Sequence, residues 1–390
     1  MTTWFVVKDD TGEKRWRGLA PRFLPRLALL ACIALVVVSL GVALTPGSPK
    51  QPVEPAFSEQ ARAAALSETL RLRAAGEQLG GSASGAGQAA LGQTVTLLTS
   101  QARALLSPGE VAPVFPSTEA AQASPATQAG QTSPGTASSP PAPLPDSPAG
   151  LAAALAASGS QRIADAAGAD GGMARLLAAV GTAQLLQASS LAAATGAPVP
   201  PQADRLPPRL SGACPGPLAS VSPAGGGAGS GVTVAQALQA AVRTELQSVY
   251  GYQLALTRLG GDAAKAAAGQ LARHEALLSE AESLSLRHCV SPSPREAGHS
   301  VAPSFLAAPG AGLAGLETGA LPVYGDLVAL GEGETREWAI SALLHTARAA
   351  AGWGAQPGPL PGLAADLESF PPLPAPQPPT PTHGGGDVGR

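Results

Sequence analysis

The sequence predicts an all-α protein in which Ala-rich helices alternate with linkers rich in proline and glycine. The 390 residues include 47 glycines and 39 prolines, well above their usual combined share of roughly 12%. Hydrophobic residues make up 45% of the chain but aromatic residues only 3%, so large core-filling rings are scarce. Alanine is the strongest helix former, whereas Pro/Gly/Ser/Thr tracts bury too little surface to offset the entropy lost on ordering. An ordinary two-domain globule of this length is therefore excluded.

An apolar segment near the start predicts a membrane anchor. Residues 27–44 are 18 residues without a charge, and a helix of this length spans about 27 Å, close to the hydrocarbon thickness of a bilayer. Most nearby Lys and Arg residues precede this segment, and only Lys50 follows closely. The positive-inside rule then keeps the N-terminus in the cytoplasm. We expect a single-pass protein of the cell membrane with the bulk of the chain extracytoplasmic.

A cleaved signal peptide is the alternative reading of this segment. Gly41 and Ala43 offer small residues three and one positions before a cut, as signal peptidases require. The basic tail is long for a signal peptide, which favours a retained anchor. Cys32 lies inside the apolar run and is expected to be buried in the span. Cys214 and Cys289 would both lie in an oxidising compartment, where pairing is favoured, and we predict a disulfide between them.

Two helical hairpins are expected next. Candidate helices at 58–79 and 88–106 are separated by a glycine-rich turn, and this hairpin alone would be marginal. A second Ala/Leu-rich hairpin is expected, with helices at 150–167 and 172–194. The expected order is a cytoplasmic basic tail at 1–26, the transmembrane anchor at 27–44, a hairpin at 57–106, a Pro/Ser/Thr-rich linker at 107–147, a second hairpin at 148–195, a Pro/Gly-rich linker at 196–231, a four-helix bundle at 232–355 and a disordered Pro/Gly-rich tail at 356–390.

The last folded region carries the most informative pattern. Thr233 and Gln236 form a capping box at a helix start. Four helices are expected at about 233–259, 262–287, 312–330 (interrupted at Pro322) and 334–352. A long Pro-rich connection separates the second helix from the third. This arrangement predicts a four-helix bundle with the ferritin-like style of connection.

Short motifs in this region resemble a known family. They are the stretch 245–252 with its Tyr-Gly-Tyr element, the Arg-His-Glu triplet at 273–275, and the Arg-to-Trp stretch at 348–353. They look like the actinobacterial ferritin-like domain of unknown function called DUF4439, over less than a third of the chain. The resemblance implies a ferritin-like four-helix fold and brings no settled activity with it.

A ferritin-type di-iron centre is not predicted. Such a centre needs a Glu from each of two helices and a Glu-x-x-His pair from each of the other two. The only Glu-x-x-His sequence, at 296–299, lies in the Pro-rich connection. The residues three positions before His274 and His345 are Leu271 and Ala342, so both bridging carboxylates are missing.

Four residues, one per expected helix, could still hold a single Fe, Mn or Zn ion. They are Glu245, His274, Glu317 and His345, and helical periodicity turns Glu245 and His274 towards the core. The favoured alternative is that Glu245 is a buried carboxylate paired with an Arg or a Tyr hydroxyl, while the two histidines are partly exposed. In that case no cofactor is expected.

Other functional signals are few. The net charge of -3 gives no basic field that would attract nucleic acid. The sequence contains no Gly-rich phosphate loop, Gly-x-Ser-x-Gly elbow, Cys-x-x-Cys pair or His-Glu-x-x-His helix, so no catalytic residue is predicted. We expect a non-catalytic structural or interaction module of a membrane-anchored envelope protein, with an envelope protein as partner. The alternatives are a mononuclear metal-binding or oxidase-like ferritin relative and a small-molecule-binding bundle.

Overall fold

The computed structural model describes residues 55–106, 143–201, 210, 214–218, 232–292, 295 and 298–373. Regular secondary structure in these residues is helical throughout, which confirms the predicted all-α class for this part of the chain. The expected tail at 1–26 and the expected anchor at 27–44 lie outside the described residues, as do most of the two linkers.

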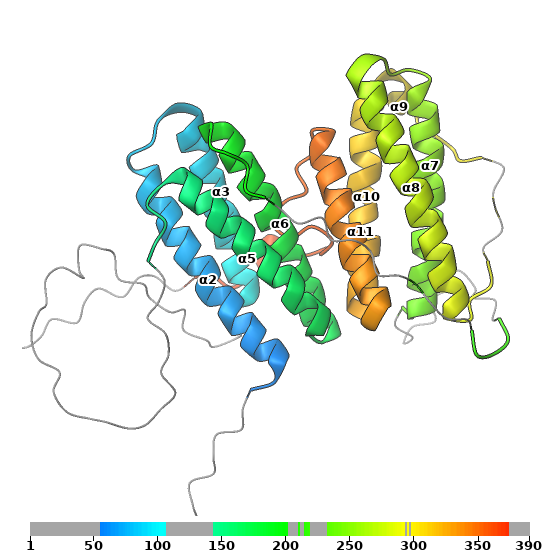
Figure 1. Ribbon diagram of the computed structural model, residues 1–390, viewed down its shortest axis with the longest axis horizontal. Coiled ribbons are helices and arrows are strands. Elements are labelled where there is room, and N and C mark those ends of the chain that lie inside the picture. Colours follow the sequence, from blue (N-terminus) through cyan, green and yellow to red (C-terminus); the bar gives the residue numbers. More distant parts are fainter. Residues whose placement is uncertain are drawn as a thin grey trace, which may run out of the picture. The chain divides into compact units, whose positions relative to one another are not determined.

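Within the described residues, the first four helices form two hairpins that pack on each other (Figure 1). They are α2 (Phe57–Gly80), α3 (Gly85–Leu105), α5 (Pro148–Gly168) and α6 (Gly171–Thr195). The side chains of Ser147 and Asp170 accept hydrogen bonds from the backbone at the starts of α5 and α6, which satisfies amides that a helix start leaves unpaired. Helix α2 contacts α5, and α3 contacts α6. Each hairpin therefore supplies the apolar partner that the other lacks.

The remaining long helices form a second group of four. They are α7 (Val234–Leu256), α8 (Gly261–Arg287), α10 (Pro309–Leu330) and α11 (Gly333–Gly352), with the short α9 (Pro303–Ala307) in the long connection before α10. The capping box of Thr233 and Gln236 is present at the start of α7. The expected interruption at Pro322 was wrong, because α10 continues through this residue. Burial of Leu321 and Tyr324 beside Pro322 offsets the backbone hydrogen bond that proline removes.

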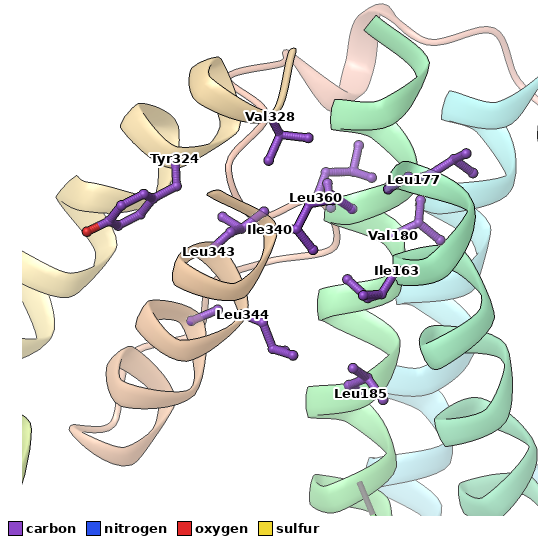
Figure 2. Close-up of a cluster of buried hydrophobic side chains, with 14 of the residues drawn as sticks. Ile163, Leu177, Val180, Leu185, Tyr324, Val328, Ile340, Leu343, Leu344 and Leu360 are labelled. Atoms are coloured by element: carbon purple, nitrogen blue, oxygen red, sulfur yellow. The ribbon is translucent and has the colours of Figure 1, made fainter. Parts of the chain in front are cut away.

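The two groups share one hydrophobic core. Side chains of Ile340, Leu343 and Leu344 on α11 belong to the same buried cluster as Ile163 on α5 and Val180 on α6, and Figure 2 shows the two sets facing each other. Leu360, from the segment after α11, lies between them (Figure 2) and is 5% exposed.

Residues 356–373 were expected in a disordered tail but pack against the first four helices. Gln101 donates a hydrogen bond to the Pro359 carbonyl at 3.0 Å, and Arg175 donates one to the Gly362 carbonyl at 2.9 Å. Further along, Arg103 donates to the Pro371 carbonyl at 3.1 Å. These side-chain donors supply partners for the backbone of a segment that has little regular structure of its own.

A disulfide joins Cys214 to Cys289, with 5.0 Å between the two Cα atoms and 75 positions between them in sequence. Cys289 lies two positions after the end of α8, and Cys214 lies ahead of α7. The bond therefore ties the segment that precedes the second group of helices to one end of that group.

Among the described helices, α6 is long and apolar enough to pass a test for a membrane span. However, 72% of its apolar window is buried inside the protein. The core helix of a protein that never meets a membrane passes the same test, so this finding is weak evidence for a span.

The backbone of α10 approaches the start of α6 so closely that only glycine fits at position 171. A Cβ atom there would lie 2.2 Å from the Ala329 carbonyl oxygen, whereas one at Gly172 meets nothing within 4 Å. We expect Gly171→Ala to lower the free energy of unfolding by about 1–3 kcal/mol, because backbone must shift to admit the methyl group. Gly172→Ala is the matched control and should be neutral or slightly stabilising. Urea denaturation followed by circular dichroism tests this, and equal midpoints for the two variants would contradict it.

Candidate functional site

A buried polar cluster lies in the second group of helices. Helices α7, α8 and α10 each contribute one ionisable side chain to it: Glu245, His274 and Glu317. Their exposed fractions are 0%, 0% and 1%. Ionisable groups are almost never buried to this extent unless they are paired.

The imidazole of His274 bridges the two carboxylates. Its Nδ1 atom lies 2.8 Å from Glu245 Oε2, and its Nε2 atom lies 2.9 Å from Glu317 Oε1. Both ring nitrogens therefore have a carboxylate partner. One side chain links three helices, and its ring orientation is fixed from both sides.

Two tyrosines and a tryptophan complete the cluster. Tyr252 donates a hydrogen bond to Glu317 Oε1 at 2.5 Å, and the Tyr324 hydroxyl donates one to Glu245 Oε1. The Trp353 ring in turn donates to the Tyr252 hydroxyl at 2.8 Å. Glu245 is therefore a buried carboxylate paired with a Tyr hydroxyl, as one sequence-based alternative expected. The tyrosine is Tyr324, which lies on α10.

Sequence reasoning did not single out Tyr324, although a signal was present. Tyr324 follows Glu317 by seven positions on α10, and residues seven apart on a helix share a face. Tyr252 likewise follows Glu245 by seven positions on α7. A glutamate followed by a tyrosine two turns later on two helices was a repeated pattern that could have revealed the cluster.

The surroundings shift the protonation equilibria of this cluster. Burial opposes the charged form of His274, but hydrogen bonds to Glu245 and Glu317 and their charges outweigh it and raise the pKa of His274 to about 9. Burial also raises the pKa of Glu245, against the opposing effect of His274. The pKa of Tyr252 is raised by burial and by the neighbouring Glu317 carboxylate. At neutral pH the His274 ring therefore holds a positive charge between the two glutamates.

The stability of the fold should consequently depend on pH. The folded-state pKa of His274, about 9, lies above its ordinary value of 6.5, so this group stabilises the fold fully below pH 6.5. That contribution is lost as the pH rises through about 9. The raised pKa of Glu245 also lowers stability as the pH rises, but this effect begins above the ordinary carboxyl pKa of 4.5 and so precedes the His274 window. We expect the free energy of unfolding to fall by roughly 3 kcal/mol over this window.

Urea denaturation at a series of pH values measures this dependence, with His274→Gln as the comparison because it cannot take up the proton. The variant should show a flatter profile between pH 6.5 and 9. If the two profiles have the same slope, His274 does not carry the proton.

The four residues predicted as metal ligands do not all meet. The structure brings Glu245, His274 and Glu317 together, but His345 Nε2 lies 2.9 Å from Gln270 Oε1 on α8. The Glu-x-x-His sequence at 296–299 begins outside the described residues.

The three that meet do not form a ready metal site. An imidazole binds a metal through a ring lone pair, and both ring nitrogens of His274 face carboxylate oxygens instead. Across the described ranges, no group of three or more His, Cys, Asp or Glu side chains is arranged to hold a metal ion. Glu317 Oε2 is buried without a hydrogen-bond partner. It is the one unsatisfied acceptor among the side chains of this cluster.

Comparison with known proteins identifies a family over the second group of helices. Residues 237–365 match the family model described as "Domain of unknown function (DUF4439)". No curated protein and no solved structure matches the chain. The matched residues include the whole Glu245–His274–Glu317 cluster, while helices α2 to α6 lie outside the match.

Proposed function

We propose that this chain, whose residues 237–365 are a DUF4439 domain, is a single-pass protein of the cell envelope. Its helical part lies outside the membrane and works as a non-catalytic structural or interaction module. The second group of helices takes a ferritin-like form. The long connection between α8 and α10, with short turns inside each hairpin, supports this form, because a ferritin-like bundle has one long crossover.

The closed hydrogen bonding of His274 is the observation that carries the non-catalytic proposal. A general base, nucleophile or metal ligand needs a reactive atom that faces its substrate or ion. Here both ring nitrogens face glutamates, and the ring is 0% exposed. A buried charge network of this kind joins helices in one arrangement, which suits a rigid scaffold.

Two observations support the location. The apolar segment at 27–44, preceded by most of the nearby basic residues, favours a span with a cytoplasmic N-terminus. The disulfide between Cys214 and Cys289 favours an oxidising compartment for the helices, since cytosolic thiols are kept reduced.

Thiol labelling of intact cells tests this topology. Cysteines are introduced singly as Thr11→Cys in the basic tail and Thr318→Cys on the exposed face of α10, with Cys214 and Cys289 replaced by serine. A membrane-impermeant maleimide should label the Thr318→Cys chain in intact cells and the Thr11→Cys chain only after lysis. Labelling of both chains, or the reverse pattern, would refute the proposed orientation.

Co-purification tests the interaction role. The full chain and a chain lacking residues 232–355 are isolated from membranes after crosslinking, and the attached proteins are compared by mass spectrometry. The deletion should remove at least one envelope protein that the full chain retains. An unchanged set of proteins would count against an interaction module.

A mononuclear metal-binding or oxidase-like domain is the alternative proposal. Three of the four predicted ligands meet in one cluster, and Glu317 Oε2 has no partner there. An ion would require the His274 ring to leave at least one carboxylate.

Elemental mass spectrometry of the full chain, after exposure to Fe, Mn or Zn, tests this alternative. A stoichiometric ion that is lost in His274→Ala and kept in His345→Ala would establish it. The absence of a bound ion would leave the scaffold proposal in place.

A further inference from the structure

A pocket separate from the buried polar cluster lies on the DUF4439 domain. It is a pocket of about 670 Å³ between α7, the start of α10 and the connection that contains α9. Ligand pockets commonly measure about 300–1,000 Å³, so its size suits a small molecule. None of the residues in the buried polar cluster around His274 lines this pocket.

The base of this pocket is apolar and closely packed. Phe305, on α9, is 8% exposed and packs against α7 and α10. A Cβ atom at Gly312 would lie 2.2 Å from the Phe305 ring, and one at Gly251 would lie 2.3 Å from Leu316. Glycine at both positions lets the backbone of two helices approach an aromatic ring and an aliphatic side chain.

One wall is built from two further rings. Tyr250 and His299 meet edge to face, with 5.5 Å between ring centroids and 66° between ring planes. Such an arrangement offers an additional planar ring both a face and an edge to pack on. Gln247, Ser300 and Ser304 also line the pocket and supply neutral hydrogen-bonding groups.

The charge of the pocket limits the chemistry of its ligand. No Asp, Glu, Lys or Arg is among the lining residues, and His299 is the one ionisable side chain that the structure places there besides Tyr250. A charged ligand would therefore lose hydration with little ionic compensation. A larger hollow of about 1110 Å³ beside α3 and α6 is lined by Arg348 and many small polar residues, but by no aromatic ring. The pocket over Phe305 therefore offers the better environment for an apolar ring.

We propose that this pocket binds a small, neutral molecule with a planar apolar ring, which lies over Phe305 and beside the Tyr250–His299 pair. The module then has a ligand site in addition to its scaffold role. Binding there does not use the Glu245–His274–Glu317 cluster, so it requires neither metal nor catalysis.

Photolabelling of the full chain in its native membrane tests the site. The probe is 3-phenyl-3-(trifluoromethyl)diazirine, a neutral aromatic compound that inserts into nearby bonds on irradiation, and the labelled peptides are mapped by mass spectrometry. Label should appear in peptides that contain residues 247–251 or 299–316, and excess non-photoreactive trifluoroethylbenzene should compete with it. Mapping separates this label from any that enters the bilayer segment.

Matched variants make the result decisive. Ala311→Trp fills the pocket and should reduce the competable label in these peptides by about tenfold or more. Thr318→Trp, on the same helix but outside the pocket, and Thr96→Trp, in the larger hollow, should leave it unchanged. Label that does not compete, or that persists in Ala311→Trp, would overturn the proposal.

Discussion

Replacement of His274 by leucine is expected to lower the free energy of unfolding by about 3–5 kcal/mol. The substitution removes the only side chain that contacts both Glu245 and Glu317 in the cluster. It leaves two carboxylates in a site where their exposed fractions are 0% and 1%. An unpaired buried charge costs far more than the net value of the original pair, because the desolvation penalty remains after the attraction is gone. Urea denaturation at pH 7, followed by circular dichroism, measures the loss.

Two further variants show whether the loss of unfolding free energy comes from the unpaired glutamates or from replacing any histidine by leucine. His345→Leu changes the same residue type on α11, where the ring is half-buried and contacts Gln270, and should cost less than about 1 kcal/mol. Adding Glu245→Gln and Glu317→Gln to His274→Leu removes both unpaired charges and should recover most of the loss. Equal destabilisation by the two histidine variants would contradict the role of His274 in the cluster.

Loss of the Cys214–Cys289 disulfide should cost about 4 kcal/mol of unfolding free energy. The bond spans 75 positions, and a closed loop of this length strongly restricts the unfolded chain. Reductant should therefore lower the denaturation midpoint of the wild-type protein to that of the Cys214→Ser/Cys289→Ser variant. It should leave the variant itself unaffected. A reductant effect of the same size on both proteins would show that it acts elsewhere.

Counting thiols provides an independent check on the same bond. The chain has three cysteines, of which Cys32 lies outside the described residues. Alkylation of the denatured chain should modify one cysteine before reduction and three after it. Three modified cysteines without reductant would show that Cys214 and Cys289 are not joined.

The sequence determined the local features of this protein. Apolar periodicity and the breaks at glycine located the long helices to within a few residues at most ends, because helix start and stop signals act over single turns. The capping box at Thr233 and Gln236 is such a signal. The inward direction of Glu245 and His274 followed from their positions on apolar helix faces. The favoured expectation that His274 is partly exposed was wrong, because its ring is paired on both sides and its exposed fraction is 0%. The DUF4439 motifs indicated the family whose model matches residues 237–365.

Only the tertiary structure decided which side chains the inward face of each helix contacts. Helical periodicity shows that His274 points inward, but it does not show that the ring meets two glutamates rather than His345. The rotation of one helix about its axis relative to another depends on how whole side-chain surfaces interlock. For the same reason the sequence did not place Leu360 in a shared core or predict that α10 continues through Pro322. These features arise from packing between distant segments, which local sequence patterns do not encode.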